Sequence, residues 1–172
     1  MADLGPNHAG RKAGLFVAAL IFVADQLTKW IVINPLQLQS VRNIQVLPFF
    51  DLTWVENRGI SLGLFTAGSE TARWVLVAVT ATIAVAVAWW MWREQRRGDQ
   101  VALGMVLGGA LGNIVDRSRF GYVVDFADLH IGEFRPFLVF NVADAAISIG
   151  VVILILRAFL VKDAPKEIPQ DA

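Results

Sequence analysis

The sequence predicts an all-α membrane protein with four transmembrane helices and a small extracytoplasmic β-sheet platform. Of its 172 residues, 56% are hydrophobic and 17% are charged, which is more apolar than a typical soluble domain. Four apolar stretches are considered as membrane spans, because about 20 helical residues cross the bilayer core. Between two of them, apolar and polar residues alternate as they do in a strand. We expect one integral membrane domain that covers residues 1–172.

The first expected span is a helix that stays in the mature chain. Arg11 and Lys12 precede its apolar run, as in a secretory signal, but no convincing small-residue cleavage site follows. The helical spacing instead continues past Asp25. The four spans are 13–33, 74–92, 101–115 and 137–160, and the third is the shortest. The polar tails at 1–10 and 163–172 are expected to be disordered.

The basic residues predict which side of the membrane each loop occupies. Cytoplasmic segments carry an excess of Lys and Arg, and the short loop 93–100 is rich in arginine. We therefore expect both termini and this loop in the cytoplasm, with loops 34–73 and 116–136 facing outward. Trp89 and Trp92 beside the inner loop fit an aromatic belt. The basic residues that this arrangement places inside are Arg11, Lys12, Arg93, Arg96, Arg97, Arg157, Lys162 and Lys166.

The outward loops contain extended segments. Residues 50–54 alternate in the manner of a strand with one apolar face. A turn at 56–59 leads into 60–65, which suggests a hairpin, and residues 122–126 are also extended in character. We expect both loops to contribute to a small, mobile sheet on the outer membrane surface. Its apolar face is expected to rest on lipid, because the hairpin is too small to make its own core.

Glycines in the third span predict close helix packing. Gly104, Gly108 and Gly112 recur every four residues, so they share one helix face and let a neighbouring helix approach closely. Gly109 widens that groove. The span then ends in an amide, a carboxylate and a guanidinium, which are Asn113, Asp116 and Arg117.

Polar residues inside the spans are candidate functional groups, because ionisable side chains are costly in lipid. Asp25 and Lys29 lie four residues apart and can form an ion pair, and the spacing is compatible both with helix packing and with a functional site. Asn141, Asp144 and Ser148 form a stripe on the fourth helix that is expected to face the bundle interior. Asp144 is expected about seven residues, roughly 10 Å, inside that helix.

Asp125 is the candidate partner of Asp144. Two carboxylates that share a site cannot both ionise easily, so one keeps a proton while the other acts as a base, as in aspartic proteases. The spacing alone leaves a second reading open, in which Asp125 is a solvated loop carboxylate.

Five segments between residues 25 and 144 together resemble the bacterial lipoprotein signal peptidases, the signal peptidase II family. They occur in the family's order and are DQLTK at 25–29, NRGISLG at 57–63, GGALGNIVDR at 108–117, VVDF at 123–126 and FNVAD at 140–144. The resemblance implies an intramembrane aspartyl endopeptidase of the bacterial inner membrane. Its substrates would be diacylglyceryl-modified prolipoproteins, cut just before the lipidated cysteine.

The resemblance also implies roles for individual residues. Asp125 and Asp144 would be the catalytic dyad, with no metal, near the outer leaflet. The positions that match residues lining the family's site are Asn57, Gly59, Asn113, Asp116, Arg117 and Asn141. Asn57 and Arg117 are suited to bind the substrate backbone and the developing oxyanion. The two other asparagines are suited to orient the carboxylates, and Asp25 and Lys29 would be supporting residues.

Composition bears on cofactors and partners. The chain has no cysteine and only two histidines, His8 and His130, which lie far apart, so thiol chemistry is excluded and a zinc site is not expected. We expect no cofactor. Fifteen basic residues balance fifteen acidic ones, so no overall field attracts nucleic acid. The expected partners are prolipoproteins and membrane lipids, and the protein is expected to act as a monomer.

Two other readings remain. The first is a small transporter or proton channel, whose relay groups would be Asp25, Lys29, Asp116 and Asp144. It requires charges spread through the membrane depth, whereas here they cluster toward one side, and no inverted repeat is visible. The second is a protease with Ser61 as nucleophile and Lys29 as base. Such an enzyme would survive the loss of Asp125.

Overall fold

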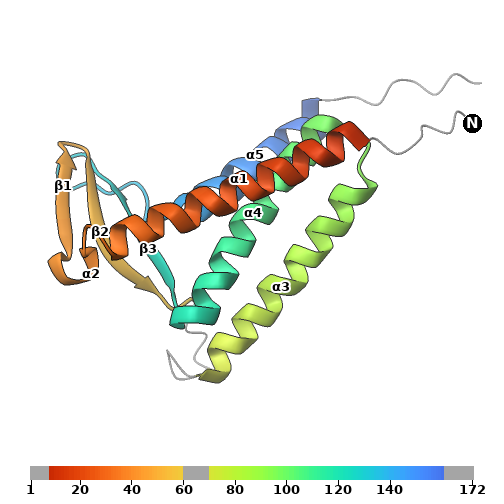
Figure 1. The fold of residues 1–172 in the computed structure, drawn as a ribbon. Coiled ribbons are helices and arrows are strands. Elements are labelled where there is room, and N and C mark those ends of the chain that lie inside the picture. The colour runs from red at the N-terminus through yellow and green to blue at the C-terminus, as the bar shows by residue number, and fades with distance from the viewer. Residues whose placement is uncertain (1–7, 60–69, 161–172) are drawn as a thin grey trace, which may run out of the picture.

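The computed structural model describes residues 8–59 and 70–160 as a helical bundle with a small sheet at one end (Figure 1). The first turn of the first helix, the connection between the third and fourth helices, and the last turn of the fifth lie at the end away from the sheet (Figure 1). In chain order the elements are α1 (His8–Ile33), α2 (Leu38–Val41), β1 (Asn43–Leu47), β2 (Phe50–Asn57), α3 (Glu70–Arg93), α4 (Arg97–Phe120), β3 (Val123–Leu129) and α5 (Val142–Leu160).

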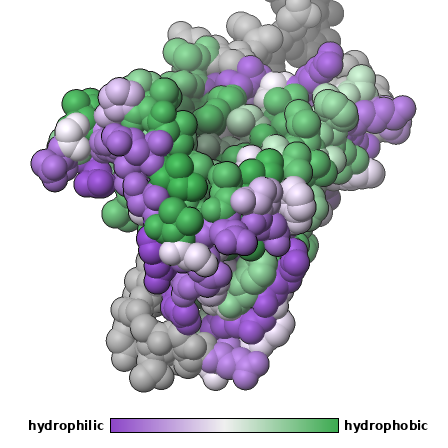
Figure 2. Space-filling model, turned by 60° about the vertical axis from the view of Figure 1, so that its left-hand side comes forward, coloured by the Kyte–Doolittle hydropathy of each residue, from purple (hydrophilic) through white to green (hydrophobic). Residues whose placement is uncertain are grey.

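Within the described residues, three helices are long and apolar enough to cross a membrane, and they are α1, α3 and α5. Their outer surfaces expose large apolar side chains, such as Phe16, Val85 and Phe159, and one face of the molecule shows a wide hydrophobic area flanked by polar patches (Figure 2). The expected third span, at 101–115, lies within α4, which packs against all three of these helices. Because its neighbours cover it, α4 needs no apolar surface against lipid.

Several helix bounds differ from the expectation. Helix α1 begins at His8, inside the tail expected to be disordered, and the tail at 163–172 lies outside the described residues. Helix α4 continues to Phe120, where Gly121 ends it with a left-handed φ of 83°. Residues 116–120 are therefore helical and not part of a loop.

Helix α5 begins at Val142, five positions after the predicted start at 137. Asn141 caps it, because its Oδ1 accepts the N–H of Asp144 at 2.9 Å while Oδ2 of Asp144 accepts the N–H of Asn141 at 3.3 Å. This reciprocal pair is a capping box. Asp144 thus lies in the first turn of the helix, and the expectation of a position about seven residues inside it is wrong.

The sheet is three-stranded and antiparallel, in the order β1-β2-β3. It joins segments of the two loops that are expected to face outward, because β2 pairs with β3 with Asn57 opposite Val123 and Val55 opposite Asp125. The other neighbour of β2 is β1. The two strands form a hairpin that the sequence pattern does not predict. The predicted second arm at 60–65 lies outside the described residues.

The apolar face of β2 covers part of the protein itself. Trp54 is only 6% exposed, and the expectation that this face rests on lipid is wrong for it. It belongs to a cluster at the C-terminal end of α1 whose buried members are Val32, Leu38, Trp54, Val124, Phe126 and Ala127. Burial of this cluster fixes the sheet against the bundle.

The glycine face of α4 is confirmed. A Cβ added at Gly104 would meet the carbonyl oxygen of Gly14, and one at Gly108 or Gly112 would also meet atoms of α1. Gly109 faces the other way, and its added Cβ would lie 2.5 Å from a carbonyl oxygen in the first turn of α5. The four-residue spacing therefore lets α4 approach α1 at backbone distance. The expectation that Gly109 widens that groove is wrong, because this glycine lets α4 approach α5 instead.

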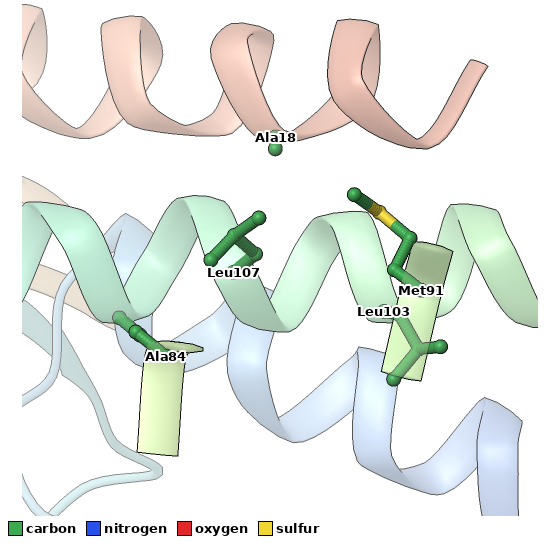
Figure 3. Close-up of a cluster of buried hydrophobic side chains, with 6 residues drawn as sticks. Ala18, Ala84, Met91, Leu103 and Leu107 are labelled. Carbon is green, nitrogen blue, oxygen red and sulfur yellow. The ribbon is translucent and has the colours of Figure 1, made fainter. Parts of the chain in front are cut away.

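The bundle core forms where α4 meets α1 and α3. Leu103 and Leu107 of α4 cluster with Ala18 of α1 and with Ala84 and Met91 of α3 (Figure 3). All five are less than 9% exposed. This packing holds α4 in the middle of the molecule and sets the position of its polar C-terminal end.

Candidate active site

Asp125 lies in β3 and is only 2% exposed, so the reading of a solvated loop carboxylate is wrong. Its Oδ1 accepts a hydrogen bond from Nδ2 of Asn141 at 2.6 Å, and its Oδ2 accepts one from Nδ2 of Asn57 at 3.0 Å. Burial, and then the charge of Asp144, raise the pKa of Asp125 from 3.8 to about 6. A carboxyl group that titrates this high can hold or release a proton near neutral pH.

Asp144 approaches the same place from the first turn of α5. It is half-buried, and its Oδ1 accepts a hydrogen bond from Nδ2 of Asn113 at 3.0 Å. Its Oδ2 faces the backbone of Asn141 in the capping box. Both oxygens of this carboxylate are thus oriented by groups of the protein.

Asn141 connects the two aspartates. Its side chain donates to Asp125, while its backbone N–H and its Oδ1 both bond to Asp144. The residue itself is 1% exposed, so these bonds form away from water. The structure therefore brings together two carboxylates from separate elements, as the sequence predicts.

Asn57 is oriented by its own turn. Its Oδ1 accepts the N–H of Gly59 at 3.0 Å, which leaves its Nδ2 to donate to Asp125. Gly59 has a φ of 83°, a left-handed conformation that favours glycine. Asn57 and Gly59 thus both line a cavity with Asp125, although only Asn57 donates to its carboxylate.

Arg117 lies at the C-terminal end of α4 and is half-buried. It interacts electrostatically first with Asp144 and then with Asp125. Its Nε is buried and has no acceptor within the described part of the chain. The guanidinium is therefore placed beside the carboxylates with a donor to spare.

Asp25, Lys29 and Asp116 form a buried ionic triad next to the dyad. Nζ of Lys29 lies 2.8 Å from Oδ2 of Asp25 and 2.8 Å from Oδ2 of Asp116, so the expected pair at 25 and 29 is confirmed and gains a second carboxylate. The amide of Gln26 bonds to both aspartates. The sequence pattern does not single out Gln26, and its only signal is an amide in an apolar helix.

Two cavities open at the dyad. One has a volume of about 290 Å³, is mostly apolar, and is lined by Asp144, Ser148 and neighbouring apolar residues. Ser148 is exposed, so the expectation that the polar stripe faces the bundle interior is wrong for Ser148, whereas it is confirmed for Asn141, which is 1% exposed. The other has a volume of about 460 Å³ and is lined by Asp125, Asn57 and the chain around them. Leu138 lines both cavities.

The arrangement fits proton transfer between two carboxylates. One buried carboxyl group with a raised pKa faces a second one, and amides and a guanidinium surround them. Within residues 8–59 and 70–160, no three His, Cys, Asp or Glu side chains are grouped so that they could hold a metal ion. The chemistry that these residues support is activation of a water molecule for attack on a carbonyl carbon.

Comparison with known proteins points the same way. The family model for signal peptidase (SPase) II matches residues 17–160. A lipoprotein signal peptidase of Sphingopyxis alaskensis is 63% identical over 147 residues, which are 86% of this chain and 85% of the relative. A lipoprotein signal peptidase of Rhizorhabdus wittichii is 56% identical over 163 residues, or 95% of this chain and 94% of the relative.

A solved structure has the same fold. It is a bacterial membrane enzyme determined by the in meso method at 1.9 Å resolution, and it is 28% identical to this chain with a TM-score of 0.74. The match covers 88% of this chain and 95% of the solved one. The similarity therefore extends over the helices and the sheet together.

Proposed function

The chain belongs to the signal peptidase II family, and from that premise we propose that Asp125 and Asp144 are its catalytic pair. It is a membrane-embedded aspartic protease that cleaves the signal peptides of lipoproteins. The transporter reading is not favoured, because the relatives that match most of the chain are peptidases. The serine reading has no support either, since Lys29 is held between two carboxylates and Ser61 lies outside the described residues.

One observation carries the proposal: Asn141 bonds to both carboxylates and so holds them in one site. In the proposed reaction the ionised carboxylate takes a proton from water while the water oxygen attacks the carbonyl carbon of the scissile bond. The protonated partner stabilises the developing oxyanion and then supplies the proton that the leaving nitrogen needs. Arg117, whose guanidinium interacts electrostatically with both carboxylates, would stabilise the same oxyanion by its positive charge.

The two cavities suggest how the substrate lies. The apolar cavity beside Asp144 fits an acyl chain of a diacylglyceryl cysteine. The cavity beside Asp125 includes Asn57 and polar groups of the 56–59 turn, which fit a peptide backbone. The scissile bond would then lie near Leu138, the residue that lines both cavities. Cleavage would occur just before the lipidated cysteine.

We propose that α4 is a fourth span and that both termini face the cytoplasm of the inner membrane, with the dyad near the outer leaflet. The support is that the first turn of α1, the α3–α4 connection and the last turn of α5 lie at one end (Figure 1). Arginines at that end stack on tryptophans, Arg11 on Trp92 and Arg93 on Trp89, as in an interfacial belt. Active extracytoplasmic reporters fused at residue 172 would overturn this topology.

We propose that the protein acts as a monomer with prolipoproteins and membrane lipids as its partners, and without nucleic acid. The support is that Asn57, Asn113 and Asn141 supply the hydrogen bonds that orient both carboxylates, so these carboxylates need no residue of a second copy for their orientation. The mass of the active species in detergent, measured by light scattering during turnover, tests this. Activity that is confined to a dimer would contradict it.

The catalytic assignment is tested by cleavage of a purified diacylated prolipoprotein. Asp125→Asn and Asp144→Asn should each abolish turnover, and the double variant should be no worse than either one, because the two residues act as a unit. Asp128→Asn is the matched control, since Asp128 is a buried aspartate of the same strand that bonds to Thr53 and Arg135. It should keep near-normal turnover. Residual cleavage by Asp144→Asn near the wild-type rate would refute the assignment.

The raised pKa of Asp125 predicts that the stability of the protein depends on pH. Because its pKa is raised from 3.8 to about 6 in the folded protein, the stability that its proton contributes is fully present below pH 3.8 and is lost as the pH rises through about 6. Asp125→Asn lacks this group. The wild type should therefore lose thermal stability relative to that variant as the pH rises through this window. Unfolding curves in detergent that stay parallel would contradict the expectation.

A further inference from the structure

Two backbone N–H groups beside the proposed catalytic aspartates donate to buried carboxylates. The N–H of Val124, which directly precedes the aspartate of β3, donates to Oδ2 of Asp116 at 3.1 Å. The N–H of Ala143, which directly precedes the aspartate of α5, donates to Oδ1 of Asp25 at 3.0 Å. Each catalytic carboxylate is thus held in place through the residue before it.

Lys29 joins these two anchoring carboxylates. Its Nζ lies 2.8 Å from each of them, and the side chains of Lys29, Asp25 and Asp116 are at most 3% exposed. Nε2 of Gln26 donates to the same two carboxylates, at 3.1 Å each. Gln26 and Lys29 of α1 therefore connect Asp116, which holds β3, to Asp25, which holds α5.

A third connection runs through Asn113. Its Oδ1 lies 3.5 Å from Nζ of Lys29, and its Nδ2 donates to Asp144 at 3.0 Å. An ion pair that only joins two helices needs none of these links. The pair of Arg157 with Asp99, at the other end of the bundle, joins α5 to α4 in that simpler way.

We propose that Lys29, with Asp25 and Asp116, is a positioning clamp that sets the distance and alignment of the two catalytic carboxylates. This inference rests on the proposed roles of Asp125 and Asp144. Lys29 does not line either cavity at the dyad, so it acts through the groups it holds and not by contact with substrate. Correct alignment of both carboxylates on one water is what the clamp contributes to turnover.

The clamp also contributes charge. The charged groups that face Asp125 are Asp144 from α5, Arg117 from α4 and Lys29 from α1. The ammonium group of Lys29 lowers the pKa of Asp125 against the larger effect of burial. Its removal should therefore shift the pH dependence of kcat to higher pH, because the base then needs a higher pH to ionise.

The test compares Lys29→Met with wild type in the cleavage assay, over a range of pH. We expect kcat to fall by about 100-fold, the loss that a displacement of about 1 Å can cause, while KM changes little. The pH profile should move to higher pH. Lys29→Arg, which keeps the charge but not the geometry, should lower kcat without moving the profile as far.

Arg157→Met is the matched control, because it breaks an ion pair between two helices far from the dyad. It should lower the melting temperature in detergent and leave kcat and the pH profile unchanged. If Lys29→Met does not fold, Gln26→Met tests the clamp, because it removes a neutral link between the same carboxylates. It should lower kcat with no shift of the profile.

The outcomes separate this inference from the proposed function. A Lys29→Met enzyme with wild-type kcat and pH profile would overturn the clamp, and so would a fall in kcat that Arg157→Met reproduces. For a variant that does not fold, unchanged kcat in Gln26→Met would overturn it. If Asp125→Asn in the same assay keeps turnover, the catalytic assignment itself fails. An inactive Asp125→Asn beside a fully active Lys29→Met would refute the clamp alone.

Discussion

Helices α3 and α4 are both 24 residues long, yet they are opposite in environment. Helix α3 buries only Ala84 and Met91, whereas α4 buries thirteen residues, four of them polar or charged. The composition of α3 marks it as a membrane span, and that of α4 does not. Apolarity along a helix therefore reports contact with lipid, and the helix that other helices cover is free to carry chemistry.

The polar groups of α4 show what this freedom is used for. Asn113 and Asp116 both face partners from other elements: Asp144 of α5, Lys29 of α1 and the backbone of Val124 in β3. The polar groups of α3 do less. Thr80 and Thr82 donate to backbone carbonyls of their own helix. Substitutions should thus have large effects on α4 and small ones on α3.

The largest effect is expected for Asn113→Leu. It removes the donor to Asp144 and the contact with Lys29, so kcat should fall roughly 10- to 100-fold, as for other groups that orient a reacting residue. Thr82→Leu on the exposed face of α3 should leave kcat unchanged. Steady-state cleavage kinetics check both, and equal activities would break the contrast between the helices.

The next largest effect is expected for Gly108→Leu. A Cβ there would meet the carbonyl oxygen of Ala18, and overpacking of this kind costs about 1 to 3 kcal/mol or more. Ala86→Leu on the exposed side of α3 should be neutral. Melting temperatures in the same detergent compare the two variants. Equal values would show that α1 and α4 are not in backbone contact.

A valine pair gives a smaller contrast. Val106 on α4 is 8% exposed and Val85 on α3 is 69% exposed. Val106→Ala should cost about 2 kcal/mol through lost burial and a cavity, whereas Val85→Ala should stay within about 0.5 kcal/mol. Chemical unfolding in detergent measures both. A larger loss for Val85→Ala would mean that α3 packs on a partner that covers it.

The smallest effect is expected where α3 touches α4 through a polar group. Arg73 donates to the carbonyl oxygens of Arg117 and Ser118 and so caps the end of α4. Arg73→Met should cost about 1 kcal/mol and reduce kcat only slightly. Arg93→Met, at the other end of α3, removes a stacking contact with Trp89 and should cost about 0.5 kcal/mol. A larger loss of stability in Arg93→Met than in Arg73→Met would argue against the cap.

The sequence predicts the parts of this fold that depend on local spacing. The four-residue glycine face, the pair at 25 and 29, and the extended segment before Asp125 follow from periodicity. Long-range pairings do not follow in this way. The contact of Lys29 with Asp116 joins residues that are far apart in the chain, and no periodicity encodes it.

The start of α5 shows a second limit. Residues 137–140 are apolar and read as helix, yet Phe140 pairs with Ala127 of β3, and Asn141 then caps the helix. A hydropathy window cannot separate an apolar extended segment from an apolar helical turn. The burial of Trp54 in one cluster with Val124 could not be predicted from the sequence either, because it depends on where β3 lies.

The backbone contacts of the clamp have an evolutionary consequence. Proline is ordinarily tolerated in the first turn of a helix and on the outward side of an edge strand, which are the positions of Ala143 and Val124. Here both N–H groups are already committed to carboxylates, and proline has none to offer. Apolar residues that fit the same buried space should therefore be the replacements at 124 and 143 during sequence drift, while proline stays absent from both.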